Sequence, residues 1–156
     1  MRSILFFLAA IIITGSSCGP CKKGTGTAET LTFGSYHGMC AGNCVHVYQL
    51  TKNMLSKDDS AKYPTGTYHF AATRIMEQSK FDRVRHLIDE IPAELLMGGS
   101  KTYGCPDCAD QGGIYISIGN SPATITYYID PTNTTDQSPA TIAYKQKIMA
   151  AIEQLN

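Results

Sequence analysis

Apolar side chains at every second position mark several stretches of the chain, a pattern typical of strands with one buried face. The clearest is Gly113–Gly119, in which isoleucines alternate with other residues. Thr124–Ile129 follows an Asn-Ser-Pro turn signal, so these two runs predict a hairpin. Cys44–Leu50 also alternates, and Thr30–Tyr36 and the start of Thr67–Met76 are rich in residues that favour strands.

A helical spacing of apolar residues replaces this alternation after Ser79. The sequence Ser-Lys-Phe-Asp resembles an acidic variant of a capping box, which predicts that a helix begins at Ser79. Pro92 lacks the N–H that a helix interior needs, so the helix should end or kink near Glu90. The buried stripe of this helix is predicted to be Phe81, Val84, Ile88 and Ile91.

A second helix is predicted at the C-terminal end of the chain. Ser138 followed by Pro139 is a typical N-cap and first helical residue. Apolar residues then recur at helical spacing, whereas Lys145 and Lys147 are expected to point mostly outward. The predicted buried stripe is Ile142, Ile148, Ile152 and Leu155.

The elements therefore occur in the order strands, helix, hairpin, helix. Strand runs interrupted by helices, without a regular strand–helix–strand rhythm, indicate an α+β fold. We expect an antiparallel sheet of about five strands with the two main helices on one face. Lys57–Lys62, which reads KDDSAK, is expected to be a solvated loop because charge runs are usually exposed.

The first residues have the layout of a bacterial export signal. Arg2 precedes the uninterrupted apolar run Ile4–Ile13, and small residues then lead to Cys18. The run is shorter than the roughly 20 apolar residues that a membrane-spanning helix needs. We therefore expect residues 1–17 to be a signal peptide. The mature chain would begin either with a lipidated Cys18 or after an ordinary secretory cut near Ser17.

Cys18 directly after small residues resembles the lipobox of bacterial lipoproteins, in the looser form seen in Bacteroidetes. That resemblance implies that Cys18 is diacylated, with palmitate-type chains that anchor the mature protein to a membrane. Glycine and threonine are frequent in residues 18–28, which predicts a flexible lipidated tether. Residues 29–156 are then expected to form a single globular domain.

Charge restricts the class of partner. The chain contains 13 basic and 13 acidic side chains, so its formal net charge is zero at pH 7. A nucleic-acid partner would normally require a basic face, and this balance argues against one. The expected contacts are instead the membrane, through the lipid on Cys18, and an unknown protein or small-molecule partner.

Six cysteines are present, and four of them form two close pairs in the globular part. Cys40 and Cys44 flank one loop, while Cys105 and Cys108 lie in the stretch YGCPDCADQGG. Export to an oxidising compartment favours disulfides, either within each pair or between the two segments. The alternatives are a zinc site with these four cysteines as ligands, because CxxC is a genuine zinc knuckle, and a thiol–disulfide redox site centred on CPDC.

Four further residues are candidate site residues. His37 and His46 lie close in sequence to the first cysteine pair, and Asp107 and Asp110 flank Cys108. Each could be an accessory metal ligand, and paired carboxylates can act as acid and base. No HExxH, GxSxG or phosphate-loop motif is present, so we expect a non-enzymatic protein without a cofactor, with zinc as the alternative.

FGSYHGMCAGNCVHVYQL, followed later by GCPDCADQGGIYI, resembles a group of small Bacteroidetes lipoproteins of unknown function. The resemblance covers most of the chain from Phe33 onward. It implies a place in the bacterial cell envelope and importance for the cysteine loops, and it implies no activity. The expected function is therefore that of a lipid-anchored binding module, in the periplasm or on the outer face, with disulfide-closed loops.

Overall fold

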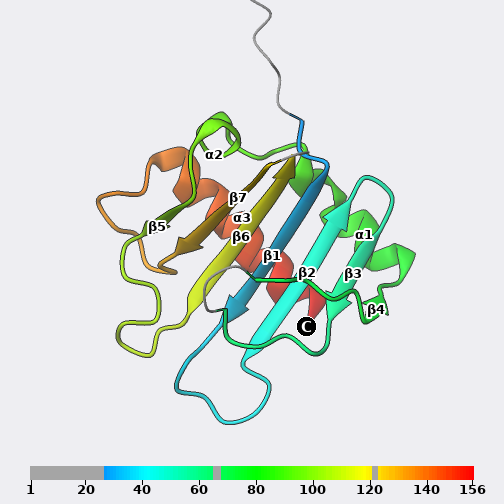
Figure 1. Cartoon of the computed structure of the whole chain (residues 1–156), viewed down its shortest axis with the longest axis horizontal. Helices are drawn as coiled ribbons and strands as arrows, with labels where there is room; N and C mark the ends of the chain where they lie inside the picture. Colours follow the sequence, from blue (N-terminus) through cyan, green and yellow to red (C-terminus); the bar gives the residue numbers. More distant parts are fainter. Residues whose placement is uncertain (1–26, 65–67, 121–122) are drawn as a thin grey trace, which may run out of the picture.

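The computed structural model describes residues 27–64, 68–120 and 123–156. In this part of the chain the fold is α+β, and the strands form one seven-stranded sheet in the order β4-β3-β2-β1-β6-β7-β5 (Figure 1). The strands are β1 Thr30–Tyr36, β2 Val45–Thr51, β3 Leu55–Asp58, β4 Arg74–Ile75, β5 Lys101–Tyr103, β6 Gly113–Asn120 and β7 Ala123–Ile129. The helices are α1 Gln78–Val84, the 3-10 helix η1 Arg85–Ile88, α2 Ala93–Met97 and α3 Pro139–Leu155.

The centre of the sheet follows the predicted alternation. Strand β1 pairs antiparallel with both β2 and β6, and β6 continues into the predicted hairpin with β7. Because successive strand residues face opposite sides, one side chain in two enters the core. Leu31 and Phe33 of β1 and Ile116 of β6 are fully buried on that side.

Helices cover one face of the sheet, as predicted, but the described residues form three α-helices and a 3-10 helix in place of two main helices. Figure 1 shows α3 running behind the central strands, with α1 beside it. All four residues of the predicted stripe after Ser79 are buried, and Leu87 joins them. The core consists of Ala28, Leu31, Phe33, Tyr48, Leu50, Leu55, Phe81, Val84, Leu87, Ile88, Ile91, Leu95, Ile114, Ile116, Ile118, Tyr127, Ile129, Tyr144, Ile148, Ala151, Ile152 and Leu155.

The prediction of about five antiparallel strands holds only in part, because the described residues form seven strands and one strand pairing is parallel. Strand β5 pairs parallel with β7, with Lys101 opposite Tyr127, so the sheet is mixed. The stretch Thr67–Met76 contributes only the two-residue edge strand β4 among its described residues. Strands this short contain too few positions to show a period of two, so the pattern could not reveal them.

The polar run Lys57–Lys62 is the predicted solvated loop only from Asp59 onward, where Asp59, Ser60 and Lys62 are exposed. Lys57 and Asp58 end strand β3, and both are buried, with 9% and 3% of their surface exposed. The Tyr68 hydroxyl donates to Asp58 at 2.5 Å, and the backbone N–H of Ala71 donates to the same carboxylate at 3.0 Å. Hydrogen bonds from the following chain, which returns over the strand, thus satisfy the buried carboxylate.

Helix ends differ from the prediction at one helix and agree at the other. Helix α1 has Glu77 at its N-cap, without a side-chain cap, so Ser79 does not start it. At α3, Ser138 is the N-cap as predicted, and its hydroxyl accepts from the Thr141 N–H at 3.1 Å. Lys145 of α3 is the larger surprise: it was expected to point outward, and it is 1% exposed.

The predicted signal peptide, Cys18 and the tether up to Gly26 lie outside the described residues. The described chain begins at Thr27, and Ala28 is already packed in the core with 5% of its surface exposed. Among the described residues, none of the helices has the length and hydropathy needed to cross a membrane.

Candidate binding site at the cysteine loops

Both cysteine loops lie at the same end of the sheet. The first cysteine loop, residues 37–44, joins β1 to β2, and the second, residues 104–112, joins β5 to β6. Tyr36, the last residue of β1, pairs with Val45 on one side and with Gly113 on the other, which brings the loops together. In Figure 1 they are the loops at the lower end of the sheet.

Each loop is closed by its own disulfide. Cys40 bonds Cys44 with a Cα–Cα distance of 5.9 Å, and Cys105 bonds Cys108 with a Cα–Cα distance of 5.6 Å. Both distances are typical of disulfides. Of the pairings that the sequence left open, the structure therefore has the two local ones, and the two segments are not crosslinked to each other.

The second cysteine loop turns sharply within a few residues. Gly104 and Gly112, at its two ends, have positive φ angles of 69° and 74°. Asp107 and Asp110 also have positive φ, at 62° and 58°. Aspartate is among the few residues that adopt this left-handed conformation at moderate cost, which explains its repeated use in the loop.

The Asp107 carboxylate holds the two loops to each other. One of its oxygens accepts the Gly38 N–H at 2.7 Å, across to the first loop, and the other accepts the Gly112 N–H at 3.1 Å. Burial, together with a hydrogen bond to Asp107, raises the pKa of the Tyr63 hydroxyl. Asp107 was a candidate ligand or acid–base group. In the structure its oxygens accept backbone N–H groups and interact with the Tyr63 hydroxyl.

The Asp130 side chain hydrogen-bonds to the backbone of the second cysteine loop. Asp130 follows β7 and is 5% exposed, and its carboxylate accepts the Cys105 N–H at 3.2 Å and the Thr132 N–H at 2.9 Å. Burial alone would raise the pKa of Asp130, but the hydrogen bonds that it accepts outweigh burial and lower it. Asp130 was not among the candidate site residues selected from the sequence. Its position directly after a strand was the available signal.

Hydrogen bonds from Lys145 hold the chain segment that follows Asp130. Its ammonium group donates to the carbonyl oxygens of Asp130 at 3.0 Å and Thr132 at 2.8 Å. It also donates to the side-chain oxygens of Gln137 at 2.7 Å and Asn133 at 3.2 Å. All four acceptors are neutral oxygens, so Lys145 acts as a buried cation that organises a loop, and burial lowers its pKa.

The remaining candidate residues are dispersed. His37 is exposed at the end of β1, and its ring lies against Gly112, where an added Cβ would collide with it. His46 is half-buried in β2, where burial, then the nearby charge of Lys57, lowers its pKa. Asp110 is exposed. Across residues 27–64, 68–120 and 123–156, no group of three or more His, Cys, Asp or Glu side chains is placed to hold a metal ion.

The tyrosines on the other face of the sheet mainly pack against one another. The Tyr36 ring contacts Tyr63 at a centroid distance of 5.0 Å, and Tyr68 contacts Tyr115 at 5.5 Å. In Figure 1, the described segments 59–64 and 68–73 pass in front of the sheet. Tyr36 and Tyr115 are consequently 3% and 2% exposed, so they are covered and do not offer a recognition surface.

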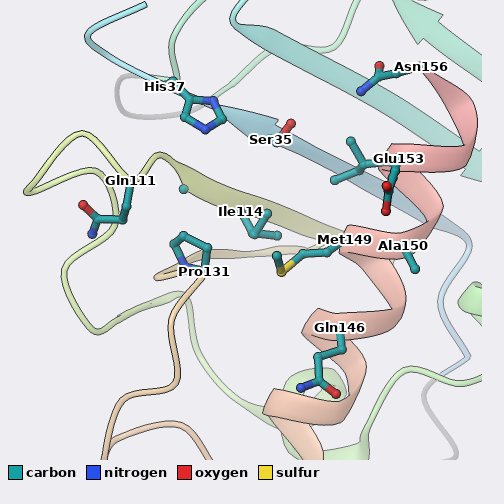
Figure 2. A pocket seen from close by; sticks show the side chains of 12 residues that line it. Ser35, His37, Gln111, Ile114, Pro131, Gln146, Met149, Ala150, Glu153 and Asn156 are labelled. Atoms are coloured by element: carbon teal, nitrogen blue, oxygen red, sulfur yellow. The ribbon is translucent and has the colours of Figure 1, made fainter.

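A groove opens beside the loops, between α3 and the adjoining ends of β1 and β6. Its volume is about 600 Å³. Figure 2 shows Met149 of α3 pointing toward Ile114 of β6, with His37 and Gln111 at the end nearest the cysteine loops. The groove is lined by Ser35, His37, Gln111, Gly113, Ile114, Pro131, Gln146, Met149, Ala150, Ile152, Glu153 and Asn156.

Comparison of the chain with protein-family models, with curated proteins and with solved structures finds no match. The resemblance to Bacteroidetes lipoproteins therefore stays a prediction. The site consists of two disulfide-closed loops beside an apolar groove, and the nearby carboxylates of Asp107 and Asp130 accept backbone N–H groups.

Proposed function

We propose that this protein is a lipid-anchored binding module of the bacterial envelope, and that its binding surface is the end of the sheet formed by the two cysteine loops and the groove. The mature chain would be attached to a membrane through lipid on Cys18. The observation on which the proposal rests is that the cysteine loops lie at the end of the sheet opposite to the end at which the chain enters the domain.

The direction of β1 supports this arrangement. Thr30 begins the strand beside Gly119, and Tyr36 ends it beside Gly113 and the loops. A strand of seven residues spans roughly 20 Å. A tether that ends near Thr30 would thus hold the domain with its cysteine loops pointing away from the membrane, where a partner could reach them.

The disulfides support an exported protein. Disulfides persist in oxidising compartments and are rare in the cytosol. Both bonds close very short loops, so their main local effect is to restrict the shape of exposed backbone. A loop of fixed shape loses less conformational entropy on binding than a free one, which favours a binding role.

The anchor is tested with two cysteine variants of the full chain. Cys18→Ala should move the protein from the detergent phase to the aqueous phase in a detergent-partition experiment, because the lipid would no longer be attached. Cys21→Ala, three residues further along, is the matched control and should leave partitioning unchanged. Partitioning of Cys18→Ala with the detergent would show that the lipid assignment is wrong.

The state of the four loop cysteines is tested by mass spectrometry of the purified protein with and without reductant. Two disulfides predict a gain of about 4 Da on reduction and no alkylation of these four cysteines without it. A bound zinc ion in the native mass, with free thiols after denaturation, would support the zinc alternative. Rapid reduction of the bond between Cys105 and Cys108 by a mild dithiol would support the redox alternative.

A further inference from the structure

The groove exists because one of the side chains that β1 directs toward the helices is small and polar, whereas the others are bulky. On the helix-facing side of β1 the row reads Leu31, Phe33, Ser35. Leu31 and Phe33 pair with Ile118 and Ile116 and are fully buried, whereas Ser35 pairs with Ile114 and is only half-buried. A serine supplies too little volume to fill the space below α3, so the Ile114 side chain lines the groove.

Helix α3 provides the opposite wall with a face separate from its buried stripe. Gln146, Met149, Ala150 and Glu153 follow one another at helical spacing and all line the groove. Met149 is 37% exposed, whereas Ile148, its neighbour in sequence, is fully buried. Methionine is unbranched and polarizable, and it adapts to differently shaped apolar partners.

The groove is too open for a free small ligand. Pockets for small molecules usually bury roughly 70–90% of the ligand surface. Here six lining residues are themselves exposed at the surface, so an occupant would remain partly in solvent: His37, Gln146, Met149, Ala150, Glu153 and Asn156. An apolar side chain projecting from a larger partner would be covered on its outer side by that partner.

The rim indicates the polarity of such a partner. Gln146 offers an exposed amide, which can donate to and accept from a peptide backbone. The Gln111 amide is already bonded within the second cysteine loop, and the Asn156 side-chain oxygen accepts the Tyr48 hydroxyl. Glu153 is the acidic residue of the lining. Within the described residues there are three ion pairs, and their acidic members are Asp59 and Glu90, so Glu153 is not part of one. A basic residue of the partner would therefore find an available carboxylate.

We infer that the groove binds a segment of a partner protein that inserts one large apolar side chain between Ile114 and Met149 and places a basic residue beside Glu153. This inference rests on the proposed function and specifies its partner. Met39, near the tip of the first cysteine loop and 79% exposed, adds a further apolar contact at the same end of the molecule.

The test uses the mature protein produced from the full chain, in mild detergent, and a defined array of synthetic decapeptides. Each peptide has a central Phe, Leu or Ser, a neighbouring Lys, Gly or Glu, and random flanking residues. We expect binding only with Phe or Leu at the centre, stronger with Lys and weaker with Glu beside it. Binding that is independent of the central residue, or the absence of binding to every peptide, would overturn the inference.

Variants then locate the binding. Ser35→Leu fills the groove and should weaken binding of the best peptide at least about tenfold. Met149→Gln, on the opposite wall, should weaken it too, while Met54→Gln, an equally exposed methionine in the turn between β2 and β3, should not. The unfolding transition of each variant is recorded. If one of the two groove variants does not fold, the other still tests the inference.

Charge is tested separately with Glu153→Gln. This variant should keep the requirement for an apolar centre and lose the preference for Lys over Glu. If Ser35→Leu abolishes binding of an apolar dye while no peptide binds the parent protein, the groove takes free small molecules and the inference is wrong. Peptide binding and dye binding do not depend on detergent partitioning. A negative binding result would therefore contradict this inference without contradicting the proposed lipid anchor.

Discussion

Two adjoining loop regions of this protein are held in place by different chemistry. The cysteine loops are exposed, and disulfides together with Asp107 hold them. The loop after β7, residues 131–138, has no disulfide and is held by the buried ammonium group of Lys145. The two regions meet at Asp130, whose side chain binds the second cysteine loop and whose carbonyl oxygen binds Lys145.

The difference reflects access to water. Inside the domain a hydrogen bond is not in competition with solvent, so a polar network can define a loop if every member is satisfied. At the surface water competes for each N–H and carbonyl group, and a few hydrogen bonds restrict a loop only weakly. Covalent bonds within the cysteine loops do not depend on solvent. We therefore expect the buried network to matter most for stability and the disulfides to matter most for local shape.

The largest effect is expected from Lys145→Met, which keeps most of the side-chain volume and removes the cation. Its oxygen acceptors would lose a charged donor, and the two backbone carbonyl oxygens would keep only the Gln137 amide, so the free energy of unfolding should fall by about 3 kcal/mol. Urea unfolding with an unchanged slope measures this. Lys147→Met is the matched control: its ion pair with Glu90 at 2.8 Å is exposed, and it should cost less than about 1 kcal/mol. Equal losses in the two variants would contradict the proposed role of the buried network.

Removing the second disulfide is expected to have an intermediate effect. The double variant Cys105→Ser, Cys108→Ser should lower the free energy of unfolding by about 2 kcal/mol, because so short a loop restricts the unfolded chain only modestly. Hydrogen exchange in the native state should increase in residues 104–112 and remain unchanged in residues 131–138. Spread of the faster exchange to the Lys145 region would show that the two regions are not independently held.

A smaller effect is expected from Asp107→Asn. Asparagine also adopts positive φ, so the backbone is preserved, but its NH₂ group must face one of the two N–H donors. The expected loss is about 1 kcal/mol, with faster exchange at the Gly38 and Gly112 amides. Asp110→Asn is the matched control, since that residue shares the positive φ and should show neither change. An unchanged exchange rate at the Gly38 amide in Asp107→Asn would show that the Asp107 carboxylate does not hold the two loops together.

The smallest effect concerns pH at the junction of the two regions. The pKa of Asp130 is lowered in the folded protein, because the hydrogen bonds to its carboxylate outweigh its burial. The unfolded state therefore binds the proton more readily, so this contribution to stability is present above the unfolded pKa and is lost as the pH falls through the lower folded value. Measured from about pH 2 to about pH 6, the unfolding free energy of Asp130→Asn should vary less with pH than that of the parent. Parallel curves for the two proteins would rule out this contribution.

The chain's local patterns predicted a large part of this architecture. Alternation in Gly113–Gly119 and Thr124–Ile129 located the central hairpin, and helical spacing located α3 and the buried stripe from Phe81 to Ile91. These patterns could be recognised because they repeat over two or more turns or pleats. The α+β class and the covering of one sheet face by helices result from them.

What the tertiary structure decided depends on residues far apart in the sequence. Lys145 and Asp58 are charged residues that a local pattern places on the surface, yet each is buried because chain segments elsewhere supply its hydrogen-bond partners. The parallel pairing of β5, the contact of Asp107 with Gly38 and the groove beside Ser35 likewise arise only when separate segments meet. Local periodicity records which face of an element is apolar, and only the assembled sheet determines what lies against that face.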